Sequence, residues 1–345
     1  ETWTFDVCAN TWLRMNPTGA LIGELSAGLV YDVDSDVTIA LGYEHISVYD
    51  ANTNTWTQPS NDTIGLEDGR IVPMGAVYDP ISGLVIAGGT FAYDVDTDTW
   101  ERHGETPLDN GPETDSEARA IYDPDSGLIV VRDIWSSEMW AYDVDTDVWT
   151  QIEQGPISPP GVPESIDSMG HNFYAQLHAY DANTDRIVLY LSDNYSNPGV
   201  LDGAGTEMTW TFDLRAGEWT IEDTLTPELG VGGFSSPAGK TTYDEATGLT
   251  VITGDGVVGG YDAARNEWEI LWANPGEPDA DGIWPGLHNR FDDHIVYDPT
   301  NDRIVVIGGV ARLLDVDPFW VLMDDVWAFD TGTGMWTQLL APPPP

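Results

Sequence analysis

Three short stretches of the sequence place aspartates at every second position, which is the spacing of the oxygen ligands in many calcium loops. They are DVDSD at 32–36 and DVDTD at 94–98 and 143–147. No glycine stands at the sixth position of any stretch, and no helical pattern flanks them, so they are not EF-hands. We expect weak Ca²⁺ binding, and no other cofactor, at Asp32, Asp34, Asp36, Asp94, Asp96, Asp98, Asp143, Asp145 and Asp147.

A structural role competes with the metal hypothesis at the first aspartate of each stretch. An aspartate that opens a tight turn accepts hydrogen bonds from backbone N–H groups two residues further on. Turns of this kind recur along the chain and open with aspartate even where no second acid follows. The first aspartate is therefore predicted to be structural. Calcium binding would depend on the third and fifth positions, such as Asp96 and Asp98.

A second set of candidates lies mostly in segments rich in proline, glycine and aromatic residues, at 153–177, 192–208, 273–293 and 310–325. Long connections on a rigid scaffold commonly carry binding sites, and arginine pairs well with carboxylates. The alternative for each residue is that it fills the centre of the fold or covers a strand edge. The predicted ligand-binding residues are Trp135, His171, Tyr195, Trp284, His288, Arg290, Arg312 and Trp320.

The elements that position these residues follow from a repeat. An aromatic residue followed by Asp, with Trp seven positions after the aromatic, occurs seven times. A second Tyr-Asp element, followed by a turn and a β-branched run, occurs six times and alternates with the first. Each element indicates a β-hairpin, so one unit contains four strands. Units 44 to 63 residues apart, built from four strands each, are typical of an all-β fold, the β-propeller.

The number of hairpins is uneven, which leaves two arrangements open for the propeller domain at 1–341. In the favoured one, seven blade positions exist and 1–15 is the outer hairpin of an incomplete first blade. In the alternative, six blades are accompanied by an extra hairpin. The complete blades are expected near 27–58, 75–103, 119–152, 177–222, 240–272 and 294–340, with a proline-rich tail or linker at 342–345.

The glycine doublets Gly88-Gly89 and Gly308-Gly309, together with the pattern W-A-Y/F-D-x-x-T-x-x-W-T-Q, resemble the Kelch repeat of bacterial galactose-oxidase-like propellers. The resemblance implies the propeller fold but no particular function, because propellers host enzymes and binding scaffolds alike. The copper centre of that family requires a tyrosine crosslinked to cysteine and two histidines. The only cysteine, Cys8, is expected in the turn of an outer hairpin on the opposite rim, so oxidase activity is not expected.

The composition excludes several classes of function. The 59 acidic and 12 basic residues give a formal net charge of -47, which disfavours nucleic acids and anionic membranes as partners. No apolar run approaches the roughly 20 residues that span a bilayer. A high acid content with a single lysine, Lys240, is compatible with secretion or a high-salt environment. We expect an extracellular or cell-surface protein, or alternatively a cytoplasmic protein of a halophile.

The predicted function is a non-catalytic scaffold that binds a protein or glycan through its loop-rich face, within a larger chain or assembly. Motifs for common catalytic sites, such as G-x-S-x-G and H-E-x-x-H, are absent from the sequence. Among so many acids, a carboxylate pair suited to glycoside chemistry is conceivable, although no pair stands out. The alternative function is therefore a carbohydrate-active enzyme, a hydrolase, lyase or oxidase, with its site at the central channel.

Overall fold

The fold is a β-propeller of six four-stranded antiparallel blades, which confirms the predicted fold class. The computed structural model describes residues 2–19, 25–42, 46–58, 76–87, 91–103, 119–132, 139–152, 175–193, 206–213, 215–224, 227, 240–254, 256–273, 290–291, 294–312, 320–323 and 325–339. All helices and strands assigned within these ranges are β-strands, and none is a helix. Within them, no helix long and apolar enough to cross a membrane occurs.

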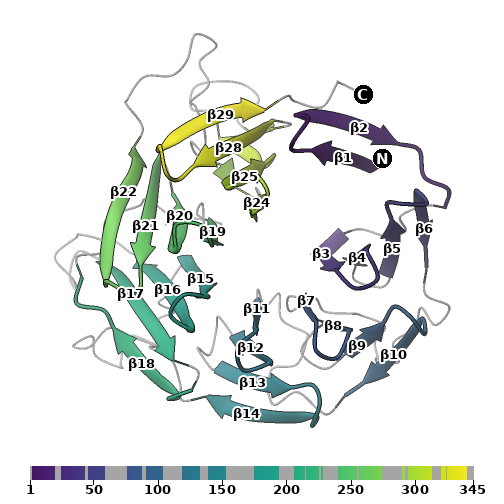
Figure 1. Ribbon diagram of the computed structural model, residues 1–345, viewed down its shortest axis with the longest axis horizontal. Helices are drawn as coiled ribbons and strands as arrows, with labels where there is room; N and C mark the ends of the chain where they lie inside the picture. Colours follow the sequence, from purple (N-terminus) through teal and green to yellow (C-terminus); the bar gives the residue numbers. More distant parts are fainter. Residues whose placement is uncertain are drawn as a thin grey trace. The chain divides into compact units, whose positions relative to one another are not determined.

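The chain divides into two compact units, and the N-terminal unit, Glu1–Trp3 with Arg14–Pro160, holds the first three blades (Figure 1). In each of these three blades, four consecutive strands pair in sequence order. We call the first two strands of a blade its inner hairpin and the last two its outer hairpin. The strands are β3 (Leu25–Asp32), β4 (Val37–Gly42), β5 (Ile46–Asp50), β6 (Thr55–Thr57), β7 (Ala76–Asp79), β8 (Leu84–Ala87), β9 (Phe91–Asp94), β10 (Thr99–Arg102), β11 (Arg119–Asp123), β12 (Leu128–Arg132), β13 (Met139–Asp143) and β14 (Val148–Ile152).

The C-terminal unit, Thr4–Leu13 with Gly161–Pro345, holds blades four to six. Their strands are β15 (Ala175–Asp181), β16 (Arg186–Asp193), β17 (Thr206–Asp213), β18 (Glu218–Ile221), β19 (Lys240–Asp244), β20 (Leu249–Thr253), β21 (Val257–Asp262), β22 (Glu267–Ala273), β24 (His294–Asp298), β25 (Arg303–Ile307), β28 (Val326–Asp330) and β29 (Met335–Leu339). The sixth blade is interrupted, because β26 (Val310–Arg312) and β27 (Trp320–Leu322) leave it and join β23 (Arg290–Phe291) in a separate sheet.

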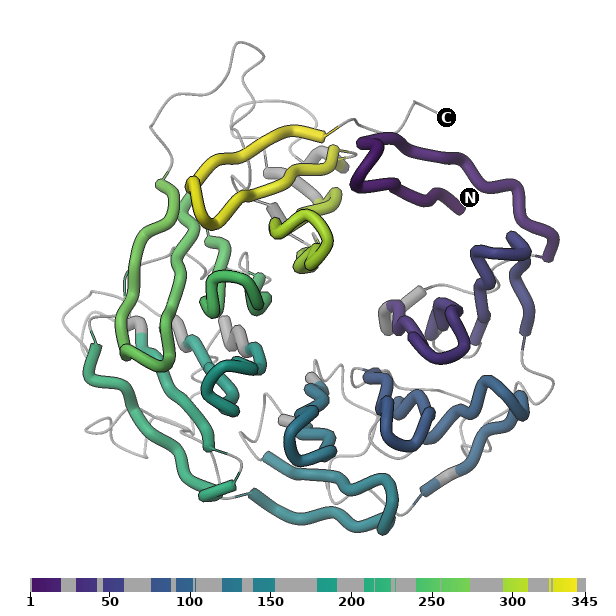
Figure 2. The backbone as a smooth tube through the Cα atoms, viewed as in Figure 1, coloured from purple at the N-terminus to yellow at the C-terminus, as the bar shows by residue number. Residues whose placement is uncertain are grey.

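Thirteen hairpin turns share one design, which Figure 2 traces along the backbone. The aspartate that opens each turn accepts a hydrogen bond from a backbone N–H two or three residues on, as Asp123 does from Asp125 at 3.0 Å. Four residues after that aspartate the backbone turns left-handed, with φ between +51° and +74°, a conformation that glycine, asparagine and aspartate tolerate best. These residues are Asn10, Asp36, Asn54, Gly83, Asp98, Gly127, Asp147, Asp185, Gly217, Gly248, Asn266, Asp302 and Gly334.

Each outer hairpin carries a pair of aromatic rings in contact, stacked or tilted, which explains the invariant spacing of seven. The strand register places the aromatic residue opposite the tryptophan, as with Tyr142 and Trp149. Ring centroids in the seven pairs lie 4.7 to 5.2 Å apart. Such pairs contribute about 0.5–1.5 kcal/mol beyond the burial of their area. The pairs are therefore part of the scaffold.

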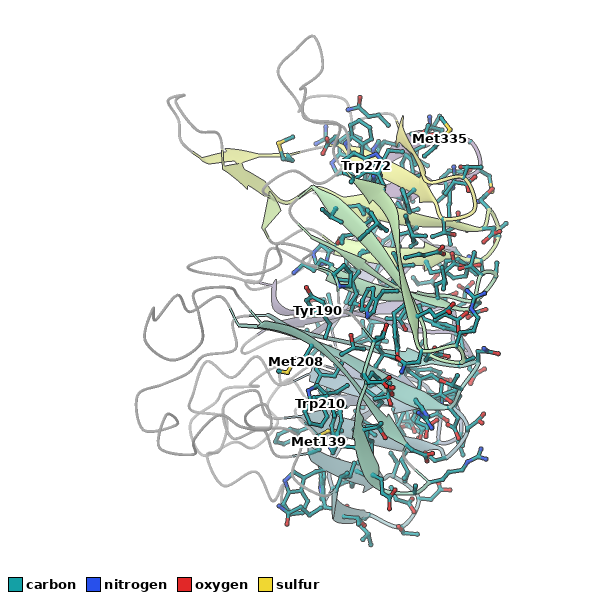
Figure 3. The ribbon with its side chains drawn as sticks, turned by 90° about the vertical axis from the view of Figure 1, so that its left-hand side faces the viewer. Met139, Tyr190, Met208, Trp210, Trp272 and Met335 are labelled. Atoms are coloured by element: carbon teal, nitrogen blue, oxygen red, sulfur yellow. The ribbon has the colours of Figure 1, made fainter. Side chains whose placement is uncertain are left out.

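The core of each unit lies where neighbouring blades face each other. In the N-terminal unit, Ile39 and Leu41 of the first blade pack with Val85 and Tyr93 of the second. In the C-terminal unit, Tyr190 on β16 packs with Ile252 of the fifth blade and meets the ring of Trp268 edge-on at 5.9 Å. Figure 3 shows Tyr190 among the side chains on the blades. The buried rows therefore join successive blades within a unit.

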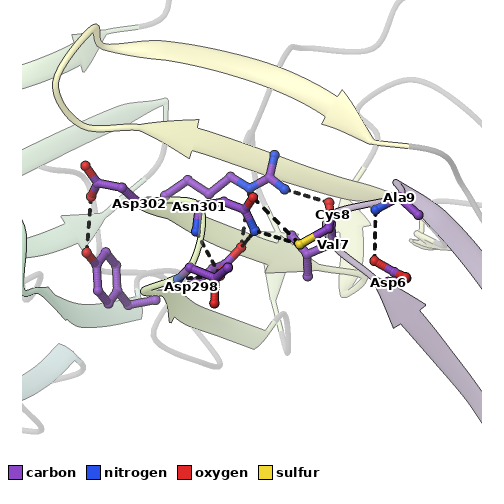
Figure 4. Close-up of polar contacts among 10 residues, drawn as sticks. Asp6, Val7, Cys8, Ala9, Asp298, Asn301 and Asp302 are labelled. Carbon is purple, nitrogen blue, oxygen red and sulfur yellow. Dashed lines mark hydrogen bonds and ion pairs between the residues drawn. The ribbon is translucent and has the colours of Figure 1, made fainter.

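The N-terminal hairpin, β1 (Thr2–Asp6) and β2 (Thr11–Met15), forms a two-stranded sheet in addition to the six complete blades. Within the C-terminal unit, Phe5, Val7 and Trp12 pack against buried side chains of the sixth blade. Arg303 Nη2 donates to the Val7 carbonyl oxygen at 2.7 Å. Figure 4 shows the Asn301 side chain beside Cys8. The turn of this hairpin is therefore held against the inner turn of the sixth blade.

Candidate functional site

Three of the eight predicted ligand-binding residues lie in a small sheet outside the blade pattern. β26 pairs with β27, which places Arg312 opposite Trp320, and β23 pairs with β26, which places Arg290 opposite Ala311. The segments 273–293 and 310–325 were predicted to be loops, but they contain the short strands β23, β26 and β27. The remaining five candidates, Trp135, His171, Tyr195, Trp284 and His288, lie outside the described residues.

The Gly308-Gly309 doublet marks the point where this extra sheet leaves the sixth blade. Both glycines have positive φ, +61° and +101°, which lets the chain turn out of β25. Gly308 N donates to the Asp325 carbonyl at 3.0 Å, and Met323 N donates to the Gly309 carbonyl at 2.8 Å. The Asp325 carboxylate is buried and accepts from Trp327 Nε1 at 2.6 Å. The base of the β26–β27 hairpin is therefore anchored on the blade.

The predicted calcium turns use most of their aspartates in the scaffold. Asp94 Oδ1 accepts from Asp96 N at 2.9 Å, as expected for a turn-opening aspartate. Asp98 adopts the left-handed conformation and accepts from the Tyr93 hydroxyl at 3.1 Å. The equivalent tyrosines at the other two turns donate to Asp36 at 2.5 Å and to Asp147 at 3.0 Å. The fifth aspartate therefore has a structural role, which the spacing of the acids did not predict.

The third aspartates differ among the three turns. Asp34 accepts from the Tyr78 hydroxyl of the second blade at 2.6 Å, whereas Asp96 and Asp145 are exposed. Across the described ranges, no three carboxylate, histidine or cysteine side chains converge in a metal-binding group. Asp96 and Asp145 are therefore the acids of these turns that remain as candidates for binding a cation from solvent.

Burial, together with neighbouring carboxylates, raises the pKa values of the tyrosines of the repeat. Burial, followed by the charge of Asp79, raises the pKa of Tyr122 to about 12. Burial likewise raises the pKa of Tyr243 and of Tyr297 to about 12, with Asp181 adding to the first and Asp302 to the second. In the opposite sense, the hydrogen bond from Tyr31 lowers the pKa of Asp36. These hydroxyls therefore remain protonated donors or acceptors at neutral pH.

Alkaline pH is expected to unfold the propeller, with the loss of stability starting near pH 10. Unfolded tyrosine ionises near pH 10, whereas Tyr122, Tyr243 and Tyr297 ionise at about 12 in the fold. Between these values the unfolded chain binds fewer protons, so stability falls as pH rises. Tyrosinate absorbance and circular dichroism should change together. Tyrosine ionisation near pH 10 with unchanged circular dichroism would contradict this expectation.

Comparison with known proteins supports the fold and leaves the activity open. No family model and no curated protein matches the sequence. The structure is similar to that of a protein from Lactobacillus plantarum, with a TM-score of 0.56, 12% identity, and coverage of 99% of this chain and 92% of that chain. This likeness is one of fold alone.

Two further solved structures resemble the chain more distantly. A fungal alcohol oxidase of the AA5 family, in complex with copper, matches over 92% of this chain and 53% of its own at 15% identity and a TM-score of 0.38. An auxiliary nutrient binding protein from Bacteroides thetaiotaomicron matches over 82% of this chain and 66% of its own at 10% identity and a TM-score of 0.47.

Proposed function

We propose that this protein is a non-catalytic binding scaffold of the Kelch type that recognises a protein or glycan outside the cell or at its surface. The sheet β23–β26–β27 carries the proposal, because it departs from the repeat and joins Arg290, Arg312 and Trp320. The paired aromatic residues of the outer hairpins contact each other, and the turn-opening aspartates accept backbone hydrogen bonds, so both sets have structural roles. Ligand recognition is thereby assigned to the connections at the other ends of the strands.

The chemistry of this sheet suits a polar ligand with a flat apolar face. Tryptophan offers a large apolar ring with one donor, which serves for stacking on a sugar or on a peptide side chain. Arginine adds a planar fork of donors for carboxylate or hydroxyl oxygens. Arginine is scarce in a chain with 12 basic residues, so two arginines in one small sheet form a distinctive recognition element.

Replacing Trp320 with alanine should weaken binding about tenfold or more, as for an aromatic anchor, and leave the melting temperature nearly unchanged. Arg312→Lys should also weaken binding, because lysine keeps the charge and loses the fork. Ligands retained by the wild type on a glycan array, and then protein ligands, would be titrated against each variant. Val148→Ala, on an exposed outer strand, is the control. Intact binding in Trp320→Ala with a large loss of stability would contradict the proposal.

We further propose that the turns at 32–36, 94–98 and 143–147 bind Ca²⁺ weakly. With a Kd of about 1 mM, typical of extracellular modules, 10 mM Ca²⁺ stabilises the fold by about 1.4 kcal/mol per site. Asp96→Asn with Asp145→Asn should reduce the rise in melting temperature, whereas Asp125→Asn, which removes an exposed acid from another turn, should not. An equal rise with Mg²⁺ at the same ionic strength would indicate screening instead.

A further inference from the structure

Inner hairpins within a unit recognise each other through the tyrosine of the Tyr-Asp motif. In the N-terminal unit, the Tyr78 hydroxyl donates to Asp34 in the turn of the preceding inner hairpin at 2.6 Å. In the C-terminal unit, the Tyr243 and Tyr297 hydroxyls accept from Asn183 N at 3.1 Å and from Ala246 N at 3.3 Å, again in the preceding turn. Each of these tyrosines is thus hydrogen-bonded to the turn of the preceding inner hairpin.

In the first blade, the side of the inner strand that contacts the preceding inner hairpin in other blades is exposed. Leu29 is 63% exposed and Tyr31 53% exposed, whereas the equivalent Ala76 and Tyr78 of the second blade are half-buried. The Tyr31 hydroxyl donates to Asp36, as Tyr297 does to Asp302. Tyr297 also accepts a turn N–H, and among the described residues no N–H reaches Tyr31. The face of β3 therefore has the apolar surface and the acceptor that bind an inner hairpin.

A face of the sixth blade, in the other unit, is exposed in a matching way. Val296 on β24 is 49% exposed, whereas its equivalents Val30 and Ala179 are 7% and 9% exposed. Between neighbouring blades of one unit, this side of the inner strand faces the following inner hairpin, as Val30 does within the first core cluster. The two exposed faces belong to separate units.

The N-terminal hairpin makes the contacts of an outer hairpin. Trp56 Nε1 donates to Thr2 Oγ1 at 2.8 Å, and Trp268 Nε1 donates to Thr209 Oγ1 at the same distance. Thr2 and Thr209 both stand three residues before the aromatic residue of the motif. In the strand order of the described chain, β1–β2 has no inner hairpin beside it, unlike every other outer hairpin.

We propose that the face of β3 formed by Leu29 and Tyr31 is a docking site for a β-hairpin of the inner type, presented by a partner polypeptide. Its apolar strand residues cover Leu29, and the N–H two residues after its turn aspartate donates to Tyr31 Oη. This is the geometry of Ala246 on Tyr297. Val296 offers a second face of the same chemistry. The inference is independent of ligand binding by the sheet β23–β26–β27.

The test uses a fluorescent peptide of residues 76–87, AVYDPISGLVIA, carrying a neutral polyethylene glycol chain for solubility and added to the full chain. We expect saturable binding, which Leu29→Asp weakens about tenfold or more through the loss of apolar burial. Tyr31→Phe keeps the ring and loses the acceptor, so it should weaken binding about threefold to tenfold. Val148→Asp, on an exposed outer strand, controls for the added charge. A peptide with Gly83→Val, which disfavours the left-handed turn, should not bind.

Two results would overturn the proposal. The first is the absence of saturable peptide binding, or equal affinity for the wild type and Leu29→Asp. The second is dimerisation of the chain in sedimentation experiments that Leu29→Asp abolishes and the peptide does not inhibit. In that case the face would be an interface between copies of this chain. Circular dichroism of Leu29→Asp and Tyr31→Phe establishes that lost binding does not reflect unfolding.

Discussion

Replacing Tyr261 with alanine is expected to lower the free energy of unfolding by about 3–5 kcal/mol, the range for large aromatic side chains removed from a core. Tyr261 is fully buried, and its ring lies 5.2 Å from that of Trp268. Its hydroxyl donates to Asn266 Oδ1 at 3.0 Å across the turn. The substitution removes this contact, opens a cavity beside Trp268 and leaves the turn without its donor. Denaturant titration monitored by circular dichroism measures the effect.

Two control variants separate the ring from the hydroxyl. Tyr261→Phe keeps the packing and should cost about 1 kcal/mol, the usual net worth of a hydrogen bond. Tyr31→Ala removes an inner-hairpin tyrosine that is 53% exposed and also donates across its own turn, to Asp36, and it should cost far less than Tyr261→Ala. Equal losses in Tyr31→Ala and Tyr261→Ala would show that burial between blades does not determine the stability of the motif.

Replacing Gly334 with asparagine is expected to destabilise the fold by more than about 2 kcal/mol, whereas Gly83→Asn should be nearly neutral. Both glycines occupy the left-handed position of a turn, with φ of +67° and +74°. A Cβ atom on Gly334 would lie 2.6 Å from the Leu271 carbonyl oxygen, while one on Gly83 meets nothing within 4 Å. The backbone conformation is the same, so the difference isolates the steric clash.

Thermal unfolding of the two glycine variants provides the measurement. Asparagine already occupies this turn position at Asn10, Asn54 and Asn266, so its conformation is compatible with the turn. Gly83→Ala and Gly334→Ala extend the comparison to a residue that tolerates positive φ less well. A similar fall in melting temperature for Gly83→Asn and Gly334→Asn would show that the close approach of Leu271 is relieved by a local shift.

The fold was predictable because the spacing of residues within the repeat reflects the pairing of the strands. The seven-residue separation of Tyr142 and Trp149 is the span of two paired strands and their turn, and the register places the two residues opposite each other. The role of Asp98 was missed because alternating carboxylates suggest a metal. The useful signal was the restriction of the fifth turn position to Asp, Asn or Gly, which indicates a left-handed backbone.

The candidate binding sheet was only partly predictable. Trp320, Arg290 and Arg312 could be selected because they lie outside the repeat, but their adjacency depends on pairing between segments far apart in the sequence. β23 and β27 contain two and three residues, too few to give a hydrophobic period. The pairing of β23 with β26 is a tertiary contact that no local pattern records.

Because all the hairpin turns share one design, the acidity of this protein can vary without a change in its fold. Asn54 and Asn266 accept a hydrogen bond from the tyrosine hydroxyl at Oδ1, as Asp98 and Asp147 do. Asparagine and aspartate are therefore interchangeable at this position as far as the hairpin is concerned. Five turns carry aspartate there, namely Asp36, Asp98, Asp147, Asp185 and Asp302. Evolution could change the charge of the molecule one residue at a time at these turns while the course of the backbone stays the same.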